Sequence, residues 1–208
     1  MKTIVCFGDS NTWGADPAGS GRLAPDVRWT GVLGAQLGTD YRIIEEGLNG
    51  RTTTVDDPIY PYLNGLSYLP ACLASHAPFD LITIMLGTND LKVRFNRTAS
   101  DIAESAAYLA QIAARSVAGI GGKPPRVLLI APPAVTTLVK FGEMLEGAIE
   151  KSNLFSRYYA AFADWDPVDF FDAGSVIRCS DLDGIHFDAA EHARLGSALA
   201  AKIRSMLG

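Results

Sequence analysis

The feature that most constrains the fold of this chain is the alternation of short apolar runs with longer segments that have helical spacing. Each run has the length of a strand buried on both faces of a sheet. The runs cover residues 3–7, 41–44, 80–86, 126–131 and 168–172. Helical spacing of apolar residues occurs in residues 29–37, 100–117 and 189–207, with a further candidate in residues 141–163. Strands that alternate with helices predict a parallel sheet covered on both faces.

Right-handed crossovers turn such a chain into a flavodoxin-like three-layer α/β/α sandwich. We expect a five-stranded parallel sheet of order 2-1-3-4-5, because this order brings together the carboxyl ends of the first three strands. With 208 residues and no linker, residues 1–208 are predicted to form a single domain. Two irregular stretches, residues 55–69 and 132–140, are predicted to shape a pocket or a subunit contact.

Polar motifs follow the first three strands, at the edge where open α/β sheets bind ligands. Ser10 lies just after the first apolar run, Gly50 after the second and Asn89 after the third. Ester chemistry on a serine needs hydrogen-bond donors for the oxyanion that forms. Ser10 is therefore the candidate nucleophile. The N–H groups of Ser10 and Gly50 and the side-chain amide of Asn89 are the candidate oxyanion donors.

A serine nucleophile also needs a base that a third group orients. The segment Asp183-Gly184-Ile185-His186 places an acid three residues before a histidine, ahead of a helical segment. Asp183 and His186 are therefore predicted to complete a triad in the chain order Ser, Asp, His. Structural alternatives exist, because serine is also a common helix cap and asparagine is common in turns.

Together these motifs resemble the SGNH hydrolase (GDSL esterase/lipase) superfamily. Its four blocks correspond to Gly8-Asp9-Ser10, to Gly50, to Gly87-Thr88-Asn89-Asp90 and to Asp183-Gly184-Ile185-His186. A narrower resemblance, carried by residues 24–33, 45–53 and 84–90, is to the bacterial arylesterase branch noted for acyl transfer and perhydrolysis.

The resemblance implies a serine carboxylic-ester hydrolase that acts on short-chain acyl or aryl esters through an acyl-enzyme, with alcohols or peroxide replacing water in some members. It implies no cofactor, a small-molecule ester as substrate and a homo-oligomer. Two positions depart from the pattern. Glu45 stands where the superfamily commonly has Asn, and Ala15 where the branch can carry an aromatic residue. Asp9, Asn11, Trp13 and Ala15 are the candidate pocket residues.

Two other functions fit parts of the pattern. A carbohydrate O-deacetylase of the same superfamily would use the same triad, and Tyr60, Tyr62 and Tyr68 would then be available to contact a sugar. A non-catalytic flavodoxin-like binding module would need the fold alone. The complete set of a nucleophile, an acid, a base and oxyanion donors argues against the binding module.

Composition narrows the range of partners and of sites. A net charge of −5 without a basic run argues against nucleic-acid binding and an anionic membrane surface. Cys6, Cys72 and Cys179 are too scattered for a disulfide framework or a zinc site, so no metal is expected. We expect a cytoplasmic protein, since no signal peptide or membrane-spanning run occurs. His76 and His192 are predicted to be surface or capping residues.

Overall fold

The computed structural model describes residues 1–138, 140–164 and 168–208 and shows one parallel sheet. Its strands are β1 (Lys2–Gly8), β2 (Tyr41–Gly47), β3 (Leu81–Met85), β4 (Arg126–Ala131) and β5 (Asp169–Asp172). Their spatial order, β2-β1-β3-β4-β5, confirms the predicted order. The strand β2 continues three residues beyond the apolar run that predicted it.

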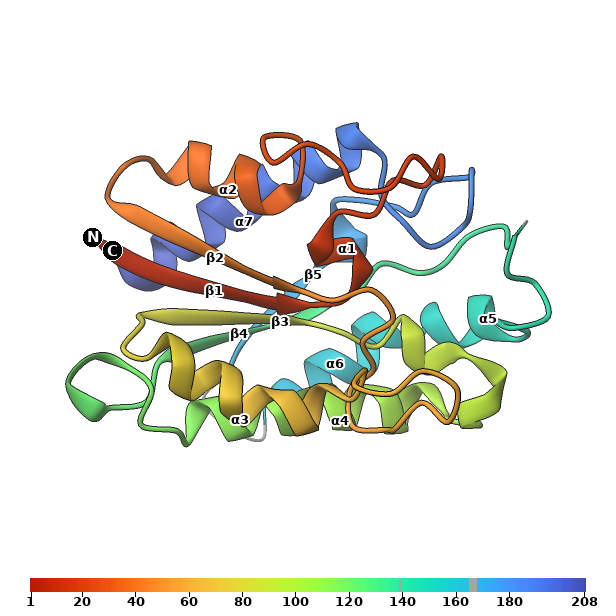
Figure 1. The fold of residues 1–208 in the computed structure, drawn as a ribbon, viewed down its shortest axis with the longest axis horizontal. Helices are drawn as coiled ribbons and strands as arrows, with labels where there is room; N and C mark the ends of the chain where they lie inside the picture. Colours follow the sequence, from red (N-terminus) through yellow and green to blue (C-terminus); the bar gives the residue numbers. More distant parts are fainter. Residues whose placement is uncertain (139, 165–167) are drawn as a thin grey trace.

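Helices cover both faces of the sheet, as Figure 1 shows. One face carries α2 (Trp29–Leu37) and α7 (Ala189–Leu207), and both helices have the predicted bounds. The other face carries α3 (Gly65–His76), α4 (Ala99–Ala114) and α6 (Phe155–Ala163). The shorter helices are α1 (Ser10–Trp13), α5 (Ala148–Ser152) and the 3-10 turns Asn89–Leu91, Val93–Phe95, Ile120–Gly122 and Ala173–Ser175.

Alternate residues of each strand face opposite layers, so the sheet separates two hydrophobic cores. In β1, Val5 and Phe7 belong to the core under α3, α4 and α6, whereas Ile4 and Cys6 belong to the core under α2 and α7. Burial on both faces explains why the central strands are almost wholly apolar. None of the helices in the described residues is long and apolar enough to cross a membrane.

The helix α4 differs from the prediction at both ends. Thr98 caps it through a capping box with Asp101, so the helix begins one residue earlier than predicted. It ends at Ala114, although the prediction extended it to Val117. Val117 is 76% exposed and therefore contributes nothing to the apolar face that the prediction assumed.

The predicted irregular stretch of residues 55–69 ends earlier than expected, because α3 begins inside it. The side chain of Asn64 accepts a hydrogen bond from the N–H of Leu66 and so caps this helix. Pro70 lies within the helix, and a proline in the interior of a segment argues against a helix when only the sequence is known.

The predicted helix of residues 141–163 is wrong as one element. It is divided into turns, α5 and α6. Gly147, just before α5, has a left-handed φ of 72°, a conformation that a continuous right-handed helix cannot pass through. Val139, within the other irregular stretch of residues 132–140, lies outside the described residues.

Candidate active site

The nucleophile candidate sits at the junction of β1 and α1. β1 ends at Gly8, and Asp9 caps α1 by accepting a hydrogen bond from the N–H of Asn11 at 3.0 Å. Ser10 is then the first residue of the short helix and is half-buried. A Cβ at Gly8 would lie 2.1 Å from Oγ1 of Thr12, so only glycine permits this tight strand-to-helix turn.

Ser10, His186 and Asp183 form a continuous hydrogen-bonded chain. Oγ of Ser10 lies 2.9 Å from Nε2 of His186, and Nδ1 of His186 lies 2.6 Å from Oδ2 of Asp183. The other carboxylate oxygen of Asp183 accepts the N–H groups of Ile185 at 3.0 Å and His186 at 2.9 Å. Burial alone would raise the pKa of Asp183, but these hydrogen bonds outweigh it and hold that pKa below its usual value.

Contacts from two other segments fix the loop that carries Asp183 and His186. The Nδ2 group of Asn11 donates to the carbonyl of Ile185 at 3.0 Å, which ties the loop to α1. On its other side, the N–H of Thr136 donates to the carbonyl of Gly184 at 2.9 Å. The distance between Ser10 and His186 is therefore held from both sides of the loop.

The candidate oxyanion donors meet at the ends of β1, β2 and β3. Gly50 has a φ of 82°, and Asn89 begins the 3-10 turn that follows β3. The Nδ2 group of Asn89 lies 3.5 Å from Oδ2 of Asp9, the residue before the nucleophile. The structure therefore brings the first three sequence motifs to one edge of the sheet, as the strand order requires.

Asp9 is a buried carboxylate at the centre of this edge, and only 2% of its surface is exposed. Burial raises the pKa of Asp9 to about 6, and the hydrogen bond from Asn11 and the charges of His186, Arg51 and Lys92 lower it only in part. A buried charge of this kind lowers the free energy of unfolding, so its presence beside Ser10 and Asn89 points to a role in the site.

Asp90 is a second buried carboxylate and ties two of the motifs together. It accepts hydrogen bonds from the N–H and the hydroxyl of Thr53 and lies 3.5 Å from Nη1 of Arg97. Burial raises the pKa of Asp90 to about 6. The turn that carries Asn89 is thereby fixed to the loop that follows Gly50.

Arg51 was not singled out in the sequence analysis. Arg51 is buried, and its Nη1 group donates to the carbonyl of Gly8 at 2.8 Å and to the carbonyl of Glu46. Its guanidinium lies 4.2 Å from the ring centre of Phe7. Arg51 thus joins the ends of β1 and β2 directly before Ser10, and its place next to Gly50 was the available signal.

The four pocket candidates differ in accessibility. Asp9 and Asn11 are buried and bond within the protein, whereas Trp13 and Ala15 are half-buried. Nε of Arg22 donates to the carbonyl of Trp13 at 2.7 Å, and the guanidinium of Arg22 lies over the Trp13 ring. Of the four, only Trp13 and Ala15 expose surface that a substrate can touch.

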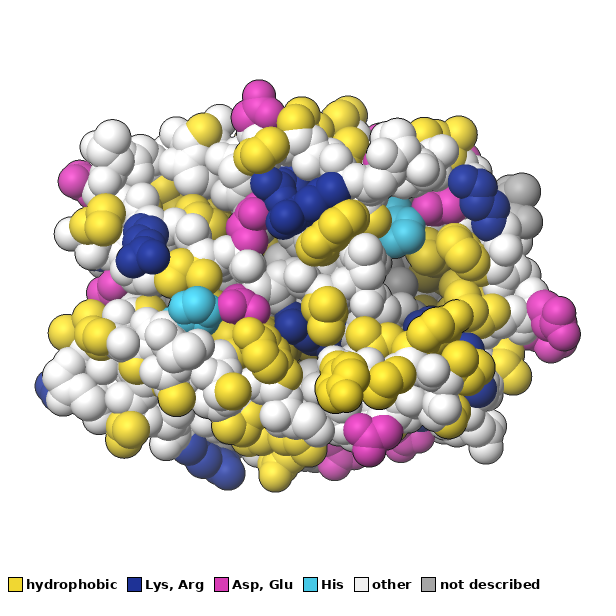
Figure 2. Space-filling view, in the orientation of Figure 1, with side chains coloured by type: hydrophobic (Ala, Val, Ile, Leu, Met, Phe, Trp, Pro, Cys, Tyr) yellow, Lys and Arg dark blue, Asp and Glu magenta, His cyan; other side chains and the backbone are white. Residues whose placement is uncertain are grey.

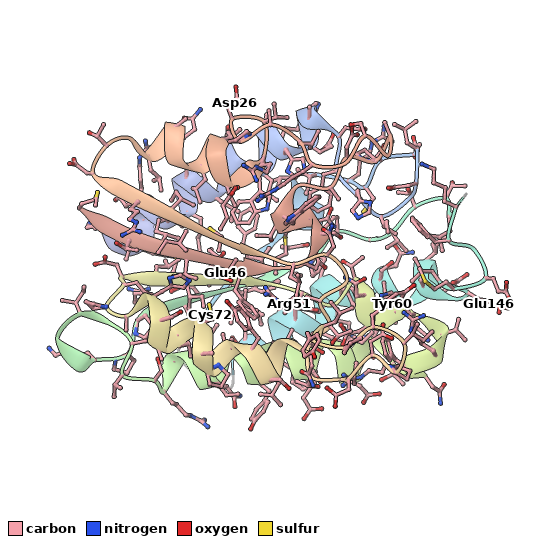
Figure 3. All side chains as sticks on the ribbon, viewed as in Figure 1. Asp26, Glu46, Arg51, Tyr60, Cys72 and Glu146 are labelled. Carbon is pink, nitrogen blue, oxygen red and sulfur yellow. The ribbon has the colours of Figure 1, made fainter. Side chains whose placement is uncertain are left out.

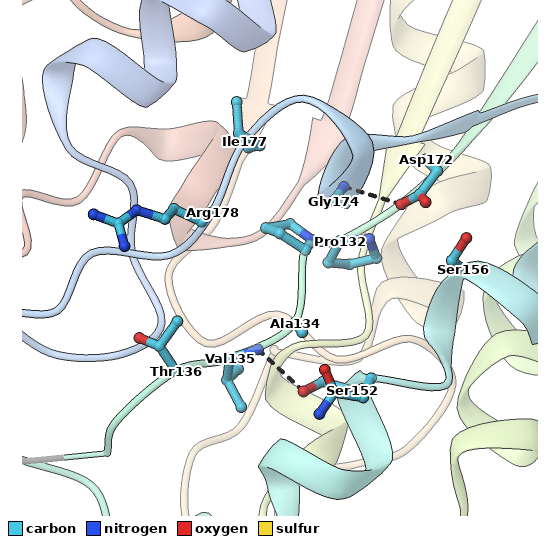
Figure 4. Close-up of a pocket in the computed structure, with 12 residues that line it drawn as sticks. Pro132, Ala134, Val135, Thr136, Ser152, Ser156, Asp172, Gly174, Ile177 and Arg178 are labelled. Carbon is cyan, nitrogen blue, oxygen red and sulfur yellow. Dashed lines mark hydrogen bonds between the residues drawn. The ribbon is translucent and has the colours of Figure 1, made fainter.

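A cavity of about 350 Å³ lies beside the triad, at the carboxyl ends of β4 and β5. Figure 4 shows its lining, with Asp172 and Ser156 on one side and Thr136 on the other. The N–H of Thr136 donates to the carbonyl of Gly184, so this cavity shares a wall with the loop that carries Asp183 and His186. Ser10 and His186 do not line it, and the cavity is therefore separate from the reacting groups.

Of the two predicted roles of His192, surface residue or helix cap, the structure shows the cap. His192 is fully buried, and its Nδ1 atom accepts the N–H of Trp29 at 3.1 Å, which caps the start of α2 from another helix. Burial lowers the pKa of His192 to about 4, so the ring is neutral at pH 7. His76 is partly exposed and pairs with Glu46.

Known proteins resemble this chain over its whole length. Residues 6–194 match the GDSL-like Lipase/Acylhydrolase family. The structure of the M. smegmatis aryl esterase is 49% identical over 100% of both chains, with a TM-score of 0.94. A carbohydrate acetylesterase from Sinorhizobium meliloti is 44% identical, again over 100% of both chains, with a TM-score of 0.95. A comparison with curated proteins gave no match.

The family match spans all four motifs, from Ser10 through Gly50 and Asn89 to Asp183 and His186. The resemblance to the SGNH superfamily, and within it to arylesterases, is thereby confirmed. The chain belongs to the GDSL-like lipase/acylhydrolase family and is an esterase of that family.

Proposed function

We propose that this esterase hydrolyses short-chain acyl and aryl esters with Ser10 as nucleophile, His186 as general base and Asp183 as the group that orients His186. The observation that carries the proposal is the hydrogen-bonded chain from Oγ of Ser10 through both ring nitrogens of His186 to Asp183. A serine nucleophile needs a hydrogen bond to its base, and the base needs a hydrogen bond to the acid that orients it; this chain contains both.

In the first half of the reaction, Oγ of Ser10 attacks the ester carbonyl while Nε2 of His186 takes the hydroxyl proton. The imidazolium then gives that proton to the leaving alkoxide or phenoxide, which leaves an acyl-enzyme on Ser10. Asp183 stabilises the imidazolium, and its pKa below the usual value keeps it ionised throughout. In the second half, water or another acceptor loses a proton to His186 and attacks the acyl-enzyme.

The tetrahedral intermediate carries a negative charge on the former carbonyl oxygen. We assign its binding to the N–H groups of Ser10 and Gly50 and to Nδ2 of Asn89, which come from the ends of three adjacent strands. The left-handed φ of Gly50 and the contact of Asn89 with Asp9 support this assignment, because both fix the direction of a donor.

The acyl or aryl group is expected to lie against Trp13 and Ala15, the two accessible pocket candidates. Ala15 leaves more room than a bulky aromatic residue would. Identity of 49% to an aryl esterase over the whole chain favours aryl esters as substrates. Acyl transfer to alcohols or peroxide follows from the same acyl-enzyme and is part of the proposal.

A carbohydrate acetylesterase is the second candidate, because one such protein from Sinorhizobium meliloti is 44% identical over the whole chain. Tyr60 and Tyr62 are more than half exposed and free to contact a sugar ring. Tyr68 is less accessible, at 38% exposed, and its hydroxyl donates to Glu46. Both activities use the same triad, so the substrate must be settled by assay.

Homo-oligomer formation stays a prediction, as does the cytoplasmic location. Figure 2 shows hydrophobic side chains gathered over the loop that follows β2, and Ile59, Tyr60 and Tyr62 of this loop are exposed. Exposed apolar patches mark interaction surfaces, and we infer that this one is an interface between subunits. Measuring the mass of the protein in solution tests this part of the proposal.

The experiment that tests the chemistry compares hydrolysis of p-nitrophenyl acetate and butyrate by the wild type, Ser10→Ala and Ser197→Ala. Ser197 lies on the exposed face of α7 and is the matched control. We expect Ser10→Ala to abolish turnover, Ser197→Ala to retain it, and an organophosphonate to label Ser10. Equal turnover in both variants would refute the role of Ser10. A parallel panel of acetylated sugars separates the two substrate classes.

A further inference from the structure

Three side chains with different donor atoms meet between the edge strand β2 and the helix α3, away from the triad. They are the carboxylate of Glu46, the thiol of Cys72 and the imidazole of His76, and their ligand atoms all lie within 4.8 Å of one another. Figure 3 shows Glu46 and Cys72 next to each other between the strand and the helix. The catalytic chemistry described above does not use any of the three.

Local structure explains why these residues converge. Cys72 and His76 are four residues apart on α3, which puts both side chains on the same face of the helix. Glu45 and Glu46 point to opposite faces of the sheet, since Glu45 pairs with Arg28 on the α2 side. Glu46 therefore points toward α3, where its Oε1 atom lies 2.6 Å from Nε2 of His76.

We propose that Glu46, Cys72 and His76 form a binding site for a divalent cation of the zinc type. Thiolate sulfur, imidazole nitrogen and carboxylate oxygen are the three kinds of ligand that zinc takes from proteins. Two ligands four residues apart on a helix, with a third from an adjacent element, is a common way to build such a site. The fourth position would be open to water.

The spacing of the ligand atoms fits this cation after small side-chain movements. Tetrahedral zinc with bonds of about 2.0–2.3 Å places its ligand atoms about 3.3–3.8 Å apart. The distance from Oε1 of Glu46 to Nε2 of His76, 2.6 Å, is shorter than that range, and no two of the three ligand atoms are more than 4.8 Å apart. The hydroxyl of Tyr68 donates to Oε2 of Glu46 at 3.2 Å and leaves Oε1 available for the metal.

The site is accessible from one side. The side chain of His76 is 24% exposed and that of Glu46 is 17% exposed, whereas Cys72 is fully buried beneath them. A hydrated cation would therefore meet His76 and Glu46 first and Cys72 last. Burial of the sulfur also favours a metal–thiolate bond, because water competes poorly for a ligand position there.

The charges in and around the cluster set the strength of binding. Burial raises the pKa of the Cys72 thiol to about 12, so the cation must displace the thiol proton, which leaves to solvent. The carboxylate and the thiolate together then carry two negative charges. Arg51 lies close enough to interact with both and offsets one of them, so binding is weaker than at a site without a nearby cation.

The sequence-level expectation of no zinc site rested on the scatter of the three cysteines. That reasoning holds for sites built from cysteine pairs, but it does not test a site with a single cysteine. The ligands here come from residues 46, 72 and 76, on a strand and a helix that only the fold brings together.

The test is a titration of the full-length reduced protein with Co²⁺ and, by competition, with Zn²⁺. Tetrahedral Co²⁺ absorbs in the visible range, and a cobalt–thiolate bond adds a charge-transfer band in the near ultraviolet. We expect one equivalent of Co²⁺ per chain to produce both signals and Zn²⁺ to remove them. Tyr68→Phe should weaken binding roughly 10-fold, the usual effect of losing a contact that orients a ligand.

Cys72→Ser and His76→Gln are the ligand variants, and Cys6→Ser is the matched control for a buried cysteine elsewhere. Circular dichroism and p-nitrophenyl acetate hydrolysis verify that each variant is folded. Loss of the near-ultraviolet band in Cys72→Ser, with retention in Cys6→Ser, supports the site. Absence of the band in the wild type, or a band of unchanged strength in His76→Gln, overturns the proposal. These outcomes do not depend on the role of Ser10.

Discussion

Replacing Asp9 by Asn should make the protein more stable and less active at the same time. Asp9 is 2% exposed, and burial raises its pKa from 3.8 to about 6. This difference means that ionised Asp9 costs the folded state about 3 kcal/mol at pH 7, since each pKa unit corresponds to about 1.4 kcal/mol. Asn has the same shape, carries no charge and keeps an oxygen that can accept the N–H of Asn11.

The sign of the pH dependence follows from the direction of the pKa change. Below pH 3.8 Asp9 is protonated in both the folded and the unfolded state, so the cost is absent. The cost develops as the pH rises from about 4 to about 6 and is constant above that range. Asp9→Asn should therefore raise the free energy of unfolding by up to about 3 kcal/mol at pH 7 and by close to zero at pH 4.

Activity should change in the opposite direction, because the Asp9 carboxylate fixes Nδ2 of Asn89. We expect kcat to fall about 10-fold, which is less than the loss of a whole oxyanion donor. The assay combines urea unfolding at pH 4, 5.5 and 7 with p-nitrophenyl acetate hydrolysis. Asp26→Asn, at an exposed position, is the control. A stability difference that does not vary with pH would refute the argument from the buried charge.

Three further changes test other parts of the site. Asn89→Ala should lower kcat about 10²–10³-fold with little change in KM, and unchanged kcat would remove Asn89 from the oxyanion site. Gly184→Ala should destabilise the acid–base loop and lower kcat, because the added Cβ would lie 2.5 Å from the carbonyl of Thr137; full activity would contradict that contact. His192→Leu should make the protein less sensitive to acid. In the wild type the folded state favours the neutral ring, so the free energy of unfolding falls by about 3 kcal/mol as the pH falls from 6.5 to about 4, and the variant should lack this loss. Unfolding curves that remain as acid-sensitive as those of the wild type would contradict it.

The sheet and the site motifs were predictable because both depend on patterns local to the sequence. Buried parallel strands are continuous apolar runs, and the motifs of Ser10, Gly50 and Asn89 follow such runs at the same edge. The strand order then followed from the need to bring Ser10, Gly50 and Asn89 together, and the structure has that order.

What the sequence did not reveal depends on contacts between distant segments. His192 was predicted to be a surface or a capping residue, and the sequence did not show which, because the group that it caps, the N–H of Trp29, is far away in the sequence. The single helix predicted for residues 141–163 is interrupted at Gly147. The spacing of apolar residues does not indicate the left-handed conformation of this glycine. Arg51 was visible as a charge, but its bond to the carbonyl of Gly8 could not be anticipated from the sequence.

The two buried carboxylates explain how loops from separate parts of the chain hold a precise geometry. Asp9, in the turn before Ser10, accepts a hydrogen bond from Asn89. Asp90, next to Asn89, accepts a hydrogen bond from Thr53 in the loop that follows Gly50. Each has its pKa raised to about 6 by burial, so each lowers the free energy of unfolding when ionised. Neutral residues would give a more stable protein with less firmly oriented donors. The stability lost to these charges is therefore linked to the orientation of the proposed oxyanion donors.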